Sequence, residues 1–331
     1  MKVGFILTNG LMGGFQTQFI NLANLFSKSY TVYFAIYLQD KIDPIILNSI
    51  NKNINYVDVN ILVDKSDIIQ TDGLLSKNIK RKLCKNKWHQ TVDWYCTTKT
   101  IPFFERILKR YTPPNIISCT NFVSKTLRIN NSHKIAVGVD IDLYRPMSDI
   151  EKKYDIMIIG RMRDVKNHRL FIEIAKKGNF SFLMIGGTAT WSTGHVNEIE
   201  KYVRENARDG IDLVTGVVEN NKVPFYINQA KIALVVSKME AQGLNSLEPM
   251  SCGVPAIGRN VGGVSESIQD FPELLIPFDA PAEVYIEKIK KYLNDGDLRL
   301  RVRKSVEDKF SIYKTYEKLE TYYKKIYEDT K

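Results

Sequence analysis

The chain is poor in the residues that build disulfide frameworks and metal centres. Of its 331 residues only four are cysteine and four are histidine. The cysteines are Cys84, Cys96, Cys119 and Cys252, and their spacing matches no metal motif, so we expect reduced cytosolic thiols. No apolar run approaches the roughly 20 residues of a membrane-spanning helix, and we see no signal peptide before the apolar stretch 3–7. These scarcities favour a cytoplasmic globular protein, and the length allows two domains.

Acidic residues are scarce in one segment, residues 70–134. The segment contains thirteen lysines and arginines, and its only acidic residues are Asp72, Asp93 and Glu105. Its own net charge therefore equals the net charge of +10 of the whole chain. A basic surface attracts an acidic partner, which we expect to be an anionic membrane surface or a polyanionic acceptor. Trp88 and Trp94 lie among these cations, a pattern that single-strand nucleic-acid binders share. Nucleic acid therefore stays open as an alternative partner.

Short apolar runs alternate with helical or loop segments along both halves of the chain. This alternation predicts an α/β fold with two Rossmann-like, doubly wound domains. The runs expected to form strands are residues 2–7, 31–37, 54–59, 67–70, 88–92, 115–119 and 134–137 in the first half, and 155–159, 180–185, 212–215, 232–236, 255–258 and 274–277 in the second. We expect residues 1–147 to form one domain and residues 148–311 the other. The amphipathic tail, residues 312–331, is expected to pack back on the first domain.

A glycine loop follows the first expected strand. Residues 8–14 include Gly13 and Gly14, and helical periodicity begins at Phe15. A strand, a glycine loop and a helix form the phosphate-facing part of a Rossmann-type unit. The spacing is not G-x-G-x-x-G, however, so the dinucleotide fingerprint is absent.

Two glutamates eight positions apart, Glu240 and Glu248, dominate the second half. They follow the apolar run 232–236, which predicts a buried parallel strand, and the turn 243–245 separates them. We expect a helix over residues 245–252, capped by asparagine or serine, with its free N–H groups directed at the strand end. Arg161 and Lys166 follow the expected strand 155–159 of the same half. Carboxylates that orient hydroxyls, beside cations that hold phosphate at a sheet edge, predict a nucleotide sugar as the ligand.

These motifs resemble those of the retaining glycosyltransferases of family 4. The resemblance rests on Gly160-Arg161 with Lys166, on the glutamate pair continuing into residues 249–255, and on the stretch NVGGVSE at residues 260–266. In the first half it covers only the Gly13-Gly14 loop, residues 67–73 and the segment 138–146. It implies the GT-B architecture, in which two Rossmann-like domains face a deep interdomain cleft.

The resemblance implies a role for each matching residue. Glu248 would hold the ribose hydroxyls of the nucleotide, and Glu240 would fix the donor sugar near its anomeric carbon. Arg161 and Lys166 would bind the diphosphate and stabilise the leaving group. The assisting backbone groups would belong to Gly243, Leu244 and Asn245, to Gly13 and Gly14, and, beside the base, to Val217. The two cations make a divalent ion unnecessary, so we expect no metal and no cofactor besides the donor substrate.

The first half departs from the family at one position. Many members carry a histidine in a Thr-x-His setting near the reactive carbon, and the matching stretch here is Thr91-Val92-Asp93. We expect Asp93 to face the cleft as a catalytic residue, while His89, four residues earlier, remains the alternative. The other histidines, His133, His168 and His195, are expected on the surface or in loops. The Asp140-Ile141-Asp142 triplet could suggest a metal that holds the diphosphate, but it lies in the hinge region and not at a strand end of the nucleotide-binding half, and the resemblance gives Asp140 a structural role.

The expected reaction is transfer of a sugar from a UDP- or GDP-linked donor to a hydroxyl of a glycan or lipid-linked acceptor. The enzyme would be a retaining, hexosyltransferase-type glycosyltransferase that works without a metal. A nucleotide-sugar epimerase or phosphorylase of the same fold stays open, as does a protein that binds nucleic acid or glycosylates a nucleobase. We expect a cytoplasmic protein, with the basic segment 70–134 available for peripheral contact with the inner membrane surface.

Overall fold

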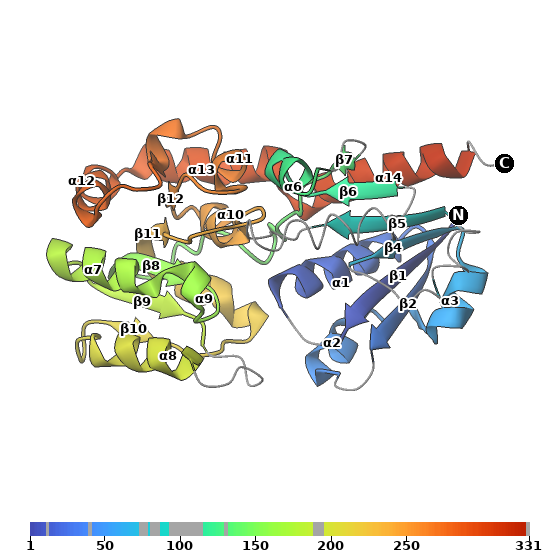
Figure 1. Ribbon diagram of the computed structural model, residues 1–331, viewed down its shortest axis with the longest axis horizontal. Helices are drawn as coiled ribbons and strands as arrows, with labels where there is room; N and C mark the ends of the chain where they lie inside the picture. Colours follow the sequence, from blue (N-terminus) through green and yellow to red (C-terminus); the bar gives the residue numbers. More distant parts are fainter. Residues whose placement is uncertain are drawn as a thin grey trace. The chain divides into compact units, whose positions relative to one another are not determined.

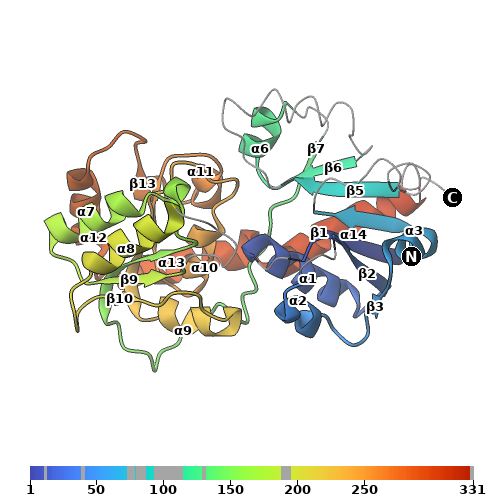
Figure 2. The same ribbon diagram turned by 60° about the horizontal axis from the view of Figure 1, so that its bottom comes forward.

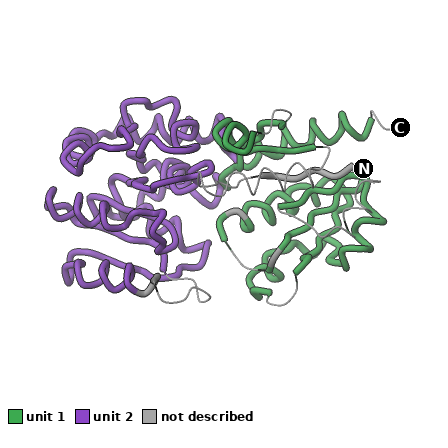
Figure 3. The backbone as a smooth tube through the Cα atoms, viewed as in Figure 1, with its two compact units in different colours: residues 1–140, 312–331 green, residues 141–311 purple. Residues whose placement is uncertain are grey.

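Two parallel β-sheets organise the protein in a computed structural model that describes residues 1–10, 13–38, 42–72, 79, 87–92, 115–128, 132–187 and 195–328. Each sheet belongs to its own compact unit (Figure 3). The first unit comprises residues 1–140 and 312–331, and the second comprises residues 141–311. The chain therefore passes from one unit to the other twice, after Asp140 and after Ser311.

Within the described residues, the first sheet has seven strands in the order β3-β2-β1-β4-β5-β6-β7, and all of its neighbours pair in parallel (Figure 1). The strands are β1 (Lys2–Asn9), β2 (Thr31–Leu38), β3 (Asn55–Tyr56), β4 (Ile68–Thr71), β5 (Lys87–Val92), β6 (Asn115–Ser118) and β7 (Ser132–Lys134). The helices of this unit are α1 (Gly14–Phe26), α2 (Pro44–Ser49), α3 (Val59–Lys65), α6 (Asn121–Thr126) and α14 (Ile312–Glu328). The direction of winding reverses between β1 and β4, as in doubly wound α/β folds.

The central strand β1 is covered by helices on both faces. Val3, Phe5 and Leu7 belong to the core that α1 and α14 complete, whereas Ile6 belongs to the core beneath α3. This alternation is the two-residue period of a strand, and both sets of side chains are apolar because both faces are buried.

The C-terminal helix α14 is part of the core of the first unit. Leu319 and Tyr323 are buried, and the Tyr323 hydroxyl donates to Oε1 of Gln70 at 2.6 Å. The Ile312 N–H donates to the carbonyl of Val139 at 2.8 Å, which joins the start of the helix to the end of residues 1–140. Figure 2 shows α14 beside the strands of this unit.

Within the described residues, the second sheet has six parallel strands in the order β10-β9-β8-β11-β12-β13 (Figure 1). The strands are β8 (Tyr154–Ile159), β9 (Phe182–Ile185), β10 (Leu213–Val214), β11 (Ala230–Val235), β12 (Ala256–Arg259) and β13 (Leu275–Ile276). The helices are α7 (His168–Gly178), α8 (His195–Glu205), α9 (Val223–Ile227), α10 (Leu244–Ser251), α11 (Val264–Ser267), α12 (Ala282–Tyr292) and α13 (Gly296–Lys309). Here the winding reverses between β8 and β11.

The segment 141–147 is bound to the second unit, although the sequence placed the domain boundary after residue 147. The Arg303 guanidinium of α13 donates to the carbonyl of Tyr144 at 2.6 Å and to that of Ile141 at 3.1 Å. The side chain of Asn228 accepts from the Met147 N–H at 2.9 Å. These bonds fix the segment against α13 and the loop that precedes β11.

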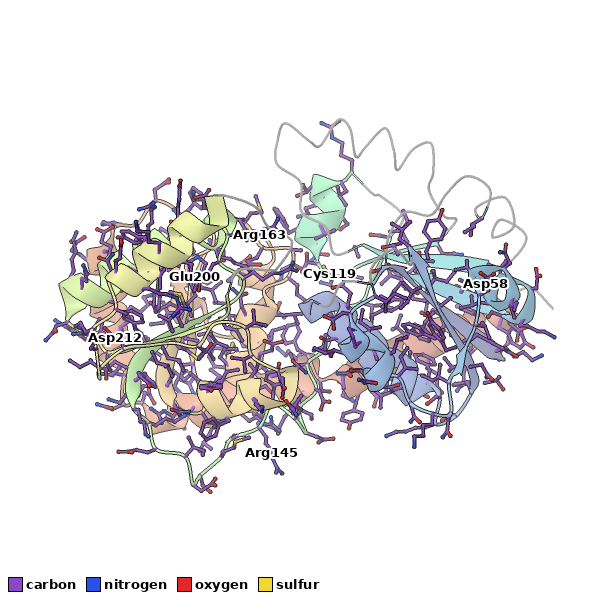
Figure 4. All side chains as sticks on the ribbon, turned by 90° about the horizontal axis from the view of Figure 1, so that it is seen from below. Asp58, Cys119, Arg145, Arg163, Glu200 and Asp212 are labelled. Carbon is purple, nitrogen blue, oxygen red and sulfur yellow. The ribbon has the colours of Figure 1, made fainter. Side chains whose placement is uncertain are left out.

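The predicted α/β fold with two doubly wound sheets is confirmed; two strands end three residues earlier than expected, and the others agree with the prediction to within two residues at each end. The expected strand 54–59 shortens to β3 because Asp58 (labelled in Figure 4) caps α3, its carboxylate accepting the Asn60 N–H at 2.7 Å. The strand expected at 134–137 is β7, which ends at Lys134. The expected tail helix coincides with α14.

Candidate active site

The loops that follow β8 and β11 meet at the carboxyl edge of the second sheet. The two strands are neighbours at the point where the winding reverses. The Lys238 N–H donates to the carbonyl of Val165 at 2.7 Å, and the Lys238 amine pairs with Asp164 at 2.7 Å, so the two loops are tied together. Open α/β sheets bind their ligands in the crevice at such a point.

Glu240, in the loop after β11, is the most tightly held carboxylate of this edge. It is only 7% exposed, and Oε1 accepts from the Lys166 amine at 2.6 Å and from the Ser237 hydroxyl at 2.6 Å. The Asn245 amide reaches the same oxygen at 3.1 Å. Within the described residues, these three hydrogen bonds to the carboxylate all end on Oε1. The other oxygen, Oε2, therefore keeps its acceptor capacity for a ligand hydroxyl.

Lys166 lies in the loop after β8, and glycine makes room for it. Gly160 has φ of +144°, and a Cβ there would lie 3.3 Å from Cε of Lys166. A side chain at position 160 would push the lysine away from Glu240. The structure thus brings together Lys166 and Glu240, which are 74 positions apart in the sequence.

Glu248, on α10, has an unusual pKa. The residue as a whole is partly exposed, but burial of its carboxyl group, the largest cause, raises the pKa to about 7, although the charge of Lys166 and the Tyr144 hydroxyl both lower it. Lys166 is thus paired with one glutamate and acts electrostatically on the other. The two predicted carboxylates and this predicted cation form one cluster.

The N-terminus of α10 starts differently from the prediction. We expected an asparagine or serine cap, but the N-cap is Gly243, with φ of +96°, and no side chain caps the helix. Leu244 and Asn245 form the start of the first turn. The N–H groups at a helix start lack intrahelical acceptors, so they are available to an anion.

Two glycines of the NVGGVSE stretch fix the loop that carries Glu240. A Cβ on Gly262, whose φ is +56°, would lie 2.0 Å from the carbonyl oxygen of Glu240. A Cβ on Gly263 would lie 2.1 Å from that of Ala241, and the Gly263 N–H donates to the Glu240 carbonyl at 3.0 Å. The backbone can approach this closely only without side chains.

Replacing Gly262 by alanine is therefore expected to displace Glu240 and to destabilise the protein by about 1–3 kcal/mol. Circular dichroism during thermal unfolding measures the loss. The matched control is Gly296→Ala in α13, where a Cβ would meet nothing within 4 Å. Equal melting temperatures for the two variants would show that the close backbone approach at Gly262 does not contribute to stability.

Arg161 and Val217, two further predicted site residues, lie in loops at the same edge of the sheet. Arg161 is the second residue after the end of β8, and its side chain is exposed. Val217 follows Gly216, which bridges to Gly186 through an N–H···O bond of 3.1 Å between the loops after β9 and β10. Val217 is 77% exposed, so its apolar surface is open to a ligand.

His168 corrects the expectation that it lies on the surface. It is 2% exposed at the start of α7, directly behind the loop that carries Lys166. Burial, and after it the charge of Lys166, lower the pKa of His168 to about 4, so the ring is neutral at physiological pH. Neither ring nitrogen of His168 has a hydrogen-bond partner among the described residues.

The first unit has, within its own sheet, a buried carboxylate to which the sequence analysis gave no role. Asp72 follows β4 at the point where the winding of the first sheet reverses, and it is 5% exposed. It accepts the Thr8 N–H at 2.6 Å, and burial raises its pKa to about 6. Its place after a parallel strand was the signal that could have found it.

The other predicted residues of the first unit are described only in part. Gly13 is the N-cap of α1 and Gly14 is its first residue, where a Cβ would meet nothing within 4 Å. Asp93 lies outside the described residues, and of His89 only the backbone, within β5, is described. Most of the basic segment 70–134 also lies outside them.

The described residues contain neither a metal-binding group nor a membrane-spanning helix. No group of three or more histidine, cysteine, aspartate or glutamate side chains in this part of the chain could hold a metal ion. No helix among the described residues is long and apolar enough to cross a membrane.

The architecture is that of the GT-B glycosyltransferases. Sucrose-phosphate synthase from Thermosynechococcus elongatus superposes with a TM-score of 0.79 at 18% identity, covering 99% of each chain. HepE from Anabaena, solved with UDP and glucose, superposes with a TM-score of 0.78 at 13% identity, covering 97% of this chain and 98% of its own. At these identities the likeness concerns the fold.

The chain belongs to the family described as glycosyl transferases group 1, whose model matches residues 140–309, just over half of the 331 residues. N-acetyl-alpha-D-glucosaminyl L-malate synthase of Bacillus anthracis is 27% identical over 202 residues, 56% of this chain and 51% of its own. The capsular polysaccharide biosynthesis glycosyltransferase CapM of Staphylococcus aureus is 28% identical over 252 residues, 71% of this chain and 63% of its own. The chain thus spans between half and two thirds of the length of these two relatives.

Proposed function

We propose that the protein transfers a sugar from a nucleoside diphosphate sugar to an acceptor hydroxyl with retention at the anomeric carbon, as the resemblance to family 4 implies. The observation that carries the proposal is the cluster of Glu240, Lys166 and Glu248 at the carboxyl edge of the second sheet. Structures of HepE include one with UDP-glucose, which supports a nucleotide sugar as the ligand of this fold.

Each group in the cluster has a task that its geometry suits. Oε2 of Glu240 receives a hydroxyl of the donor sugar, while Oε1 stays bound to its three donors. Lys166, Arg161 and the first N–H groups of α10 neutralise the diphosphate. Glu248 accepts the ribose hydroxyls, and the exposed Val217 lies against the base.

The transfer itself proceeds on one face of the sugar. The bond between the anomeric carbon and the diphosphate oxygen breaks, and its electron pair leaves with the diphosphate. The acceptor oxygen forms the new bond on the same face, and its proton passes to the departing phosphate oxygen. Glu240 is a poor covalent nucleophile, because three hydrogen bonds already draw on its charge. Lys166 and Arg161 stabilise the charge that develops on the diphosphate, so the proposal needs no metal.

The acceptor in this proposal is a glycan or a lipid-linked glycan. CapM is named for capsular polysaccharide biosynthesis, which supports a glycan acceptor. The basic segment 70–134 suits an acceptor held at an anionic membrane surface. The relatives reported above are named as a synthase and a glycosyltransferase, which does not favour an epimerase, a phosphorylase or a nucleic-acid binder.

A thermal-shift panel of UDP-, GDP- and ADP-sugars tests the donor. A ligand at 100 times its dissociation constant stabilises the folded protein by about 2.7 kcal/mol, so one nucleotide series is expected to raise the melting temperature. Free sugars at the same concentration are the control. If every nucleotide sugar leaves the melting temperature unchanged, the proposed function is wrong. An assay with the bound donor alone separates transfer from epimerisation, because only an epimerase converts the donor without an acceptor.

A further inference from the structure

Asn245, in the first turn of α10, has a side chain that does not serve the helix. The N-cap of α10 is Gly243, and no side chain caps the helix. Asparagine is a weak helix former that favours caps and turns, because its side chain competes for backbone hydrogen bonds. Its place within the first turn, without a capping role, therefore needs another explanation.

The orientation of the Asn245 amide is fixed by Glu240. Nδ2 donates to Oε1 of Glu240 at 3.1 Å. The reversed amide would set its oxygen against Oε1, and two acceptors without a proton between them repel. In the observed orientation Oδ1 is buried and has no hydrogen-bond partner among the described residues. A buried acceptor without a partner destabilises the folded state, so the contact with Glu240 is made although the amide oxygen stays unsatisfied.

The three donors to Oε1 of Glu240 come from different places in the fold. Lys166 lies in the loop after β8, Ser237 lies in the loop that also carries Glu240, and Asn245 lies on α10. In the proposed function the charge of Lys166 is shared with the diphosphate, so this donor is not reserved for Glu240. Of the three, Asn245 is the one that ties the carboxylate to the helix whose first N–H groups are available to an anion.

We propose that Asn245 is a positioning residue for the donor sugar: its side-chain amide holds the Glu240 carboxylate in the orientation that presents Oε2 to a sugar hydroxyl. Asn245 acts through Glu240. Rotation of the carboxylate would exchange its two oxygens and break the bonds to Oε1, so each donor to Oε1 resists it. The identity of the ligand group rests on the proposed function, whereas the contact between Asn245 and Glu240 does not.

Asn245→Ala tests the proposal, because it removes the amide and keeps the backbone N–H at the start of α10. Calorimetric titration compares UDP-glucose with UDP, which lacks the sugar. The variant is expected to bind UDP-glucose about fivefold more weakly, as for the loss of one hydrogen bond, and to bind UDP within about twofold of wild type. An equal loss for both ligands would overturn the proposal, because it would indicate damage to the helix start. Unchanged affinity for UDP-glucose would overturn it as well.

Asn55→Ala is the matched control. It removes an amide that donates to the carbonyl of Val32 at the same distance of 3.1 Å, in the first unit. This variant is expected to leave the affinities for UDP and UDP-glucose unchanged.

A second measurement needs no ligand. The shift in the urea midpoint caused by Asn245→Ala is measured in the wild type and in Glu240→Ala. In the wild type the substitution loses the bond to Glu240 and also removes the unsatisfied oxygen, whereas in Glu240→Ala there is no such bond to lose. Asn245→Ala is therefore expected to raise the midpoint more in the Glu240→Ala background. Equal shifts would refute the contact whatever the ligand. Unequal shifts, with no nucleotide sugar bound by wild-type protein, would refute the proposed function and the role toward the sugar.

Discussion

Lys166→Ala is expected to lower the rate of sugar transfer by about a hundredfold, equivalent to about 3 kcal/mol in the barrier. The Lys166 amine lies 2.6 Å from Oε1 of Glu240, and its charge also acts on Glu248. Without this lysine, two carboxylates would repel the incoming diphosphate. The substitution also removes the cation that stabilises the leaving group. Release of nucleoside diphosphate from the donor, measured with acceptor present, reports the rate. Adding Arg161→Ala is expected to deepen the loss.

Lys238→Ala is the matched control for Lys166→Ala. Lys238 is also a cation at this edge of the sheet and is paired with an acidic side chain, Asp164. That pair is exposed, and exposed ion pairs contribute little. The control is expected to keep activity within about twofold of wild type. If the Arg161→Ala, Lys166→Ala double variant turned over at the wild-type rate, neither cation would stabilise the leaving group.

Glu248→Gln is expected to make the ligand-free protein more stable and the donor complex weaker. The pKa of Glu248 is raised from 4.5 to about 7, so between these values the folded state binds a proton that the unfolded state has released. The free energy of unfolding therefore falls as pH rises from 4.5 to about 7. Above pH 7 the ionised Glu248 destabilises the folded protein by its full amount. The shift corresponds to roughly 3 kcal/mol, of which glutamine is expected to recover about 2 kcal/mol at pH 8. The gain vanishes as the pH falls toward 4.5.

The same substitution is expected to weaken donor binding by about 10–100-fold at pH 8, because hydrogen bonds to a charged group contribute about 1.5–3 kcal/mol. Urea unfolding and calorimetric titration measure the two effects. Glu283→Gln is the control, since this exposed glutamate pairs with Lys177 on the surface and its pKa is lowered rather than raised. A Glu248→Gln variant that is less stable than wild type at pH 8 would contradict the buried charge. One that binds the donor normally would contradict the role in binding.

The parts of this structure that the sequence predicted well are those encoded by local patterns. The strands of the second sheet are mostly apolar because both faces are buried, and the apolar run of β11 placed Glu240 in the loop that follows that strand. Lys166 and Glu240 were expected at one edge because parallel strands of one sheet end together. Their ion pair agrees with that expectation.

The features that the sequence did not predict depend on contacts between distant segments. The burial of His168 follows from how α7 packs on the second sheet, and its neighbours along the chain are polar. The hydroxyl of Tyr144 meets Asn220 across 76 positions. The cap of α10 was misassigned because asparagine and serine are common caps, whereas a glycine with positive φ was needed for the turn. The sequence analysis gave Asp72 no role in a site, because its position depends on the order of the strands in the first sheet.

The helix α14 determines the order in which the protein can be completed during synthesis. All the residues of the second unit lie within 141–311, so this unit has its whole core once residue 311 has left the ribosome. The first unit begins at residue 1 but needs Leu319 and Tyr323 to close its core. The half that is translated first must therefore wait, with an open hydrophobic face, for the segment 312–328, and it matures after its downstream neighbour.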